Sequence, residues 1–154
     1  MYISDLKAYL QIDFPIGTDS PLYYAPNLYL NGELLSGDIT IPDGVTRIPN
    51  YLFYKSKNIT GIVIPDSVTS IGTSAFEDCK SLTNVVIGNG LETIGYHSFN
   101  NCINLKSINI PNSVTGIGYR AFFGCSSLTS IVIPDSFRCI VGEAFACTGL
   151  ISIT

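Results

Sequence analysis

Hydrophobic and polar positions follow two patterns that alternate along the chain. The first is LTNVVI at 82–87, which ends in a strict alternation with apolar Val85 and Ile87. A period of two predicts a β-strand whose alternate side chains point into a core. The second is VTSIG at 68–72, which predicts a shorter return strand. Proline follows three of the first strands and ends them, because it cannot donate to a strand ladder.

Both patterns recur at a constant interval along the chain, which we call the repeat interval. The copies are 42–64, 65–87, 88–110, 111–133 and a truncated copy at 134–154. The last copy has one residue fewer, which we place between Phe145 and Cys147. A constant interval of this length is typical of a solenoid, whose coils stack on one another. We therefore expect a repeat solenoid, mainly β, of about five coils over residues 42–154.

A short segment, such as 75–79, joins the return strand at 68–72 to the strand at 82–87 of the same copy. It is too short for a full helix and predicts a turn or a 3₁₀ segment. Each repeat carries a phenylalanine in this segment, and stacked coils would place the rings in one buried column. These residues are Phe53, Phe76, Phe99, Phe122 and Phe145.

Residues 1–41 depart from the repeat and predict an irregular cap at the N-terminal end of the stack. Ser4 can cap a short helix over 5–11. Prolines then break any helix, so 14–27 is expected to be an irregular wrapped segment. Residues 28–35 predict a β-hairpin, in which Asn31-Gly32 supplies the positive φ angles of a type I′ turn. The first strand of the stack is expected at 38–41.

The repeat follows the pattern P-D/N-S-V-T-x-I-G-x-x-A-F-x-x-C-x-x-L-x-x-I-x-I, which resembles the BspA-type leucine-rich repeat. The resemblance covers roughly residues 36–154 and is closest over 65–133. It implies a right-handed leucine-rich-repeat solenoid. It also implies a bacterial or protist surface protein, and some members of the family are reported to adhere to host matrix proteins.

Charge and hydropathy narrow the classes of partner. Charged residues make up 13% of the chain, against about 25% in a typical protein. The net charge of −4 argues against nucleic acid, which requires a surface of Lys and Arg. No apolar window reaches the length of a transmembrane helix. The first residues do not form a secretory signal, so the protein is either intracellular or a piece of a longer exported chain.

Three cysteines, Cys79, Cys102 and Cys125, lie at the repeat interval, and Cys147 is one residue out of step. We interpret them as buried reduced thiols that pack as small apolar groups. Disulfides and a zinc site are the alternatives, although no C-x-x-C pair is present. Ser56 occupies the same position in the first regular repeat, which favours packing. Cys139 is outside this set and is the thiol expected to be open to chemistry. No cofactor is expected.

His97 and a set of Asx residues are two further candidate sites. His97 is expected on an exposed outer turn, and no Ser-His-Asp or Cys-His arrangement can be built from it. The chain is therefore not expected to be an enzyme. An Asx residue follows each first strand and is expected to form a turn by bonding its own backbone, with calcium binding as the alternative. These residues are Asp43, Asp66, Asn89, Asn112 and Asp135.

The face of the sheet that points away from the core is the most favoured binding surface. Its expected contact residues are Asn84, Val86, Ser107, Asn109, Ser130 and Val132, and the face also includes Gly61, Val63, Ser152 and Thr154. An alternative contact set lies on the outer turns, at Tyr54, Lys55, Tyr96, Tyr119 and Arg120, since exposed Tyr and Arg are favoured at interfaces.

These observations predict a non-catalytic module for protein–protein interaction or adhesion. It would be part of a cell-surface or secreted protein whose partner is a host matrix protein or a protein of a neighbouring cell. The alternative is a spacer array that has no ligand of its own. Because Ile151 and Ile153 lie at an unpaired coil edge, we also expect the chain to associate end to end.

Overall fold

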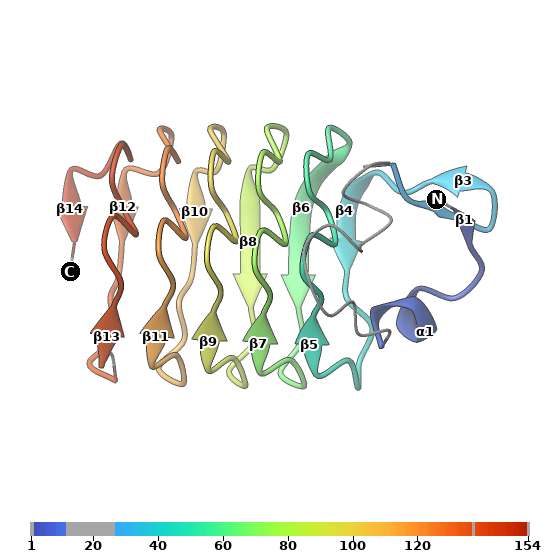
Figure 1. Cartoon of the computed structure of the whole chain (residues 1–154), viewed down its shortest axis with the longest axis horizontal. Coiled ribbons are helices and arrows are strands. Elements are labelled where there is room, and N and C mark those ends of the chain that lie inside the picture. Colours follow the sequence, from blue (N-terminus) through green and yellow to red (C-terminus); the bar gives the residue numbers. More distant parts are fainter. Residues whose placement is uncertain (1, 12–26, 137, 154) are drawn as a thin grey trace.

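The computed structural model describes residues 2–11, 27–136 and 138–153. The chain forms a stack of coils along one axis, with the N-terminal elements at one end and β13 and β14 at the other (Figure 1). Almost all pairing between coils is parallel, and the described part of the chain contains a single short α-helix. This confirms the predicted repeat solenoid of about five coils.

The strands predicted by the first pattern, which we call the first strands, form a parallel sheet in the order β4-β6-β8-β10. Beside this sheet, β12 pairs with β14. The strands are β4 (Gly37–Thr40), β6 (Ile59–Ile64), β8 (Asn84–Ile87), β10 (Ser107–Ile108), β12 (Ser130–Ile131) and β14 (Ser152–Ile153). Residues one repeat apart are partners, as in the pair Ser107 and Asn84. The first strand of this sheet begins one residue earlier than predicted.

The return strands form a second parallel sheet in the order β5-β7-β9-β11-β13. These are β5 (Arg47–Ile48), β7 (Ser70–Ile71), β9 (Thr93–Ile94), β11 (Gly116–Ile117) and β13 (Cys139–Ile140). The core lies between the two sheets, and it contains the predicted phenylalanine column. The ring centroids of successive phenylalanines lie 5.5, 5.0, 5.3 and 5.2 Å apart from Phe53 to Phe145. Stacked rings thus join every coil to the next.

A glycine follows most return strands because successive coils approach closely there. A Cβ on Gly95 would lie 2.6 Å from the carbonyl oxygen of Ile71 in the preceding coil. The N–H of Gly95 donates to that same oxygen at 2.9 Å. The close approach that allows this hydrogen bond between coils therefore also requires a residue without a side chain at position 95.

The segment after each return strand consists of turns, and none of its described residues is assigned to a 3₁₀ helix. Each turn has two residues with positive φ. The first set is Tyr51, Ser74, His97, Arg120 and Glu143, and the second is Lys55, Asp78, Asn101, Gly124 and Cys147. Both sets keep the repeat interval, so Cys147 is equivalent to Gly124. The missing residue therefore lies after Cys147, and its predicted position between Phe145 and Cys147 is wrong.

The N-terminal region contains the expected helix and hairpin with two differences. Helix α1 (Leu6–Leu10) is capped by Asp5, whose carboxylate accepts from the N–H of Ala8 at 3.0 Å, and not by Ser4. An unpredicted strand, β1 (Tyr2–Ile3), pairs in parallel with β2 (Tyr29–Leu30). Strand β2 forms the predicted hairpin with β3 (Glu33–Leu34), and Asn31 and Gly32 both have positive φ. The segment predicted to be irregular, 14–27, lies outside the described residues except for Asn27.

Candidate functional site

The outward face of the first sheet and of the adjoining coil carries an exposed column of Val63, Val86, Asn109 and Val132, one residue per coil, which we call the valine column. The side chains of Val63, Val86 and Val132 are 40%, 43% and 63% exposed, and Val63 is the ladder partner of Val86. The predicted polar positions Asn84, Ser107, Asn109 and Ser130 are also exposed. Gly61 is an exception, since it is buried beneath the carboxylate of Asp38, which leaves no room for a Cβ.

Polar side chains on this face bond to the protein itself. The hydroxyl of Ser107 donates to Asn84 Oδ1 at 3.0 Å. The Asn109 amide donates to the carbonyl oxygen of Ile87 at 2.8 Å and accepts from the N–H of Ile87 at 2.9 Å. Asn109, predicted as a contact residue, thus extends the strand ladder through its side chain. What the face offers outward is mainly β-branched apolar surface.

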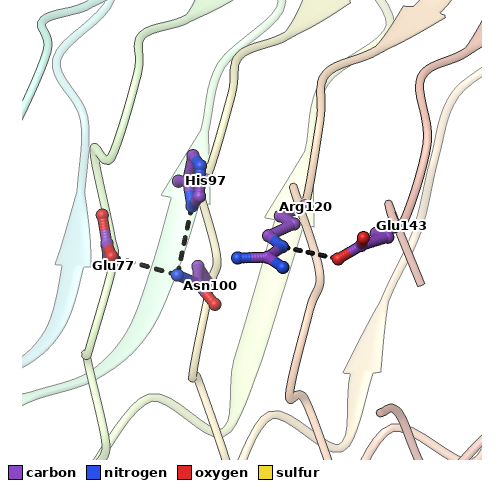
Figure 2. Close-up of polar contacts among 5 residues, drawn as sticks. All are labelled: Glu77, His97, Asn100, Arg120 and Glu143. Carbon is purple, nitrogen blue, oxygen red and sulfur yellow. Dashed lines mark hydrogen bonds and ion pairs between the residues drawn. The ribbon is translucent and has the colours of Figure 1, made fainter. Parts of the chain in front are cut away.

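The outer turns carry the alternative contact set. Tyr96 is 55% exposed, whereas Tyr54, Tyr119 and Arg120 are half-buried. The Nε of Arg120 donates to Glu143 Oε2 at 2.7 Å (Figure 2). Its guanidinium also lies 4.7 Å from the ring centroid of Phe123. The hydrogen bond to Glu143 raises the pKa of Arg120 and so favours its charged form.

His97 is half-buried, so its predicted exposure is wrong. Its Nδ1 lies 3.2 Å from Nδ2 of Asn100, which also donates to Glu77 Oε1 at 3.0 Å (Figure 2). Because an amide nitrogen only donates, His97 Nδ1 is the acceptor here. The ring also packs edge-on against Tyr119 in the next coil, with centroids 5.6 Å apart. His97 therefore links side chains within and between coils.

The three cysteines at the repeat interval are buried and free. Their Sγ atoms donate to carbonyl oxygens of the preceding coil: Cys79 to Phe53 at 2.9 Å, Cys102 to Phe76 at 3.1 Å and Cys125 to Phe99 at 3.1 Å. Burial raises the pKa of Cys79 and Cys125 to about 12 and that of Cys102 well above its ordinary value. The packing interpretation is thus supported. Cys139 is exposed as expected, and Cys147 is exposed as well.

Among the acidic and amide residues that follow the first strands, Asp66 joins two coils through its side chain. Asp66 Oδ1 accepts from the N–H of Asn89, one coil further on, at 2.6 Å, and not from its own turn as predicted. Within the described residues no three His, Cys, Asp or Glu side chains gather as metal ligands would. The same residues include no helix long and apolar enough to cross a membrane.

Comparison with known proteins accounts for this architecture. The family model described as BspA type leucine rich repeat region matches residues 46–154 in six copies. The chain belongs to this family. No curated protein matches the chain.

Solved structures of bacterial leucine-rich repeat proteins resemble this BspA-type chain. The T. pallidum leucine-rich repeat protein is 33% identical with a TM-score of 0.73, covering 75% of this chain and 57% of that one. A leucine-rich cell surface protein from Faecalibacterium prausnitzii is 39% identical with a TM-score of 0.72, covering 75% and 31%. A Bacteroides ovatus protein is 32% identical with a TM-score of 0.71, covering 79% and 36%. The chain thus spans between 31% and 57% of their length.

Two hollows in this BspA-type stack were missed by sequence reasoning. One of about 190 Å³ lies on the second sheet, and its lining includes Tyr96, Gly116 and Val141. The other, of about 160 Å³, is lined by Lys55, Lys57, Asp78 and Lys80. Its signal in the sequence was the repeat interval that separates Lys57 from Lys80.

Proposed function

We propose that this chain is a module that binds an extended segment of another protein on the outward face of the sheet β4-β6-β8-β10. Leucine-rich repeat proteins of this family are generally protein-interaction modules, and their fold is typically non-catalytic. The proposal rests on the exposed side chains of the valine column. Neighbouring polar groups on the same face form hydrogen bonds within the protein.

A flat face of this kind suits a protein strand better than a small molecule. Small ligands need an enclosing pocket with convergent polar groups, whereas the valine column is open. A partner that crosses several coils would bury apolar surface on each of the stacked strands. Val63 and Val86 supply adjacent contacts of this kind.

The cellular context that we propose is the surface or the exterior of a bacterium. The F. prausnitzii relative is described as a cell surface protein. Adhesion to a host matrix protein or to a protein of a neighbouring cell is the function that fits this location. A spacer array without a ligand is the competing proposal.

Binding to an immobilised panel of extracellular matrix and plasma proteins tests the proposal. We expect a saturable interaction that Val86→Lys weakens at least tenfold, because a charged side chain would interrupt the valine column. Thr93→Lys, an exposed position on the opposite sheet, is the matched control and should bind like the parent chain. Absence of binding at micromolar concentration would favour the spacer, and equal weakening by both variants would remove the site from this face.

We also propose that the β13–β14 end of the stack pairs with a second copy. Ile140 is 47% exposed although its equivalent in the preceding coil, Ile117, is buried. Ile151, which precedes β14, is 87% exposed. In the described chain β13 and β14 each pair with one strand only, so an uncovered core section lies beside open strand edges.

A further inference from the structure

Three lysines surround the hollow of about 160 Å³ on the first two regular coils, which we call the lysine hollow. It is lined by Lys55, Lys57, Asp78 and Lys80. The chain has eight Lys and Arg in total and a net charge of −4. Three of its eight cations therefore line a single hollow, together with one carboxylate among the described lining residues.

Bonds between coils hold the backbone beneath each lysine. The carbonyl oxygen of Lys57 accepts from the hydroxyl of Ser81 at 2.7 Å. The carbonyl oxygen of Lys80 accepts from the amide of Asn104 at 2.8 Å. Lys57 and Lys80 occupy equivalent positions in adjacent coils, which stack about 4.8 Å apart. Their side chains therefore start from neighbouring fixed points.

Lys55 completes the arrangement from the turn. Its N–H donates to the carbonyl oxygen of Glu77 at 2.8 Å, and its Nζ lies 4.7 Å from the ring centroid of Tyr54. The equivalent residue in the next coil is Asp78, the one carboxylate among the described residues that line the hollow. Lys57 and Lys80 together carry two positive charges against the one negative charge of Asp78, which favours an anionic ligand.

We propose that the lysine hollow binds carboxylate side chains of a short acidic peptide segment. The cationic stripe is short, because the positions that follow Lys57 and Lys80 in the next coils are Ile103 and Ser126. A long polyanion such as nucleic acid would extend beyond it over a chain of net negative charge. At about 160 Å³ the hollow is small, so single carboxylate side chains of such a segment would enter it and not the whole segment.

The position of the hollow connects it with the sheet face. Lys57 lies just before β6 and Lys80 just before β8. A segment crossing the valine column could therefore place an acidic residue against the lysines. This connection rests on the proposed function, whereas binding of an acidic peptide by the hollow does not.

Calorimetric titration of the 154-residue chain with an acetylated, amidated tetra-aspartate peptide at low ionic strength tests the proposal. We expect Lys57→Ala with Lys80→Ala to reduce the affinity at least tenfold. The control is Lys7→Ala with Lys106→Ala, which removes the same charge elsewhere and should have a much smaller effect. A wild-type chain that does not bind the peptide, or an equal loss in both double variants, would overturn the proposal.

Asp78→Asn provides a second test, because its expected effect is an increase in affinity, which a loss of folding would not produce. Asparagine is tolerated at this positive φ, since Asn101 occupies the equivalent position with φ 58°. Removing the carboxylate should increase the affinity for the peptide several-fold, and an unchanged affinity would place the peptide elsewhere. Since no residue is shared with Val86→Lys, failure here would leave the sheet-face proposal standing, and the reverse also holds.

Discussion

Each buried cysteine satisfies two demands at one position, which are small volume and a hydrogen-bond donor for the preceding coil. Ser56 occupies this position in the first regular coil and is buried. Thr148 occupies it in the last, where its hydroxyl donates within its own coil, to the carbonyl oxygen of Phe145 at 2.8 Å. Serine and threonine share only size and a donor with cysteine. The position therefore accepts a small polar side chain and does not depend on a thiol.

Thiol labelling should divide the five cysteines into two classes. In the native chain Cys139 and Cys147 should react with a thiol reagent, because they are exposed. The buried thiols should stay unreactive as the pH rises from 8 to 10, since burial raises their pKa above that range and keeps them protonated. Mass spectrometry should count two labels on the native chain and five after unfolding. Labelling of Cys102 in the native chain would contradict the buried arrangement.

At the scale of the coil, close approach of backbones limits the side chains that fit. A Cβ on Gly95 or Gly118 would lie too close to atoms of the preceding coil. Side chains also extend the ladders between coils, as Asn109 does for Ile87. Strand β10 has two residues, but its pairing with β8 continues beyond them through this amide. The coil therefore combines backbone and side-chain pairing.

Two glycine substitutions should separate crowding from loss of flexibility. Gly95→Ala should lower the free energy of unfolding by about 1–3 kcal/mol, because the new Cβ meets the backbone of the preceding coil. Gly116→Ala is the control, since nothing lies within 4 Å of the Cβ it would add. It should be neutral or slightly stabilising. Chemical denaturation measures the free energy of unfolding of both variants. An equal loss in the two would mean that the spacing between coils adjusts to the added Cβ.

The whole molecule has unlike ends. Helix α1 and strands β1 to β3 lie at the N-terminal end (Figure 1). At the other end Phe145 and Leu150 are only partly buried, although Phe122 and Leu128 in the preceding coil are fully buried. In a repeat array each coil is stabilised by its neighbours. The β13–β14 end of the described chain thus presents apolar side chains that are buried in the preceding coil.

Sedimentation equilibrium should therefore show self-association that increases with protein concentration. Ile140→Lys should shift the chain toward the monomer, because it places a charge on the uncovered end. Val86→Lys, which lies on the sheet face away from that end, should leave association unchanged. A parent chain that stays monomeric at every concentration would contradict end-to-end pairing.

The sequence by itself determined the features that depend on equivalence between repeats. The constant repeat interval establishes which residues stack, so the phenylalanine column and the buried cysteines could be predicted from spacing alone. The alternation of apolar residues likewise predicted that Val86 and Val132 point outward. Asn31-Gly32 predicted the hairpin because few other residue pairs accept two positive φ angles.

Only the tertiary structure decided where polar side chains find partners. Spacing could not show that Asp66 bonds the next coil, that Asn109 serves a strand, or that Asp5 and not Ser4 caps the helix. Each is a choice between nearby donors and acceptors, and the choice depends on distances of a few tenths of an ångström. The lysine hollow arises in the same way, since repeat spacing aligns Lys57 with Lys80 but only the turn geometry brings Lys55 and Asp78 beside them.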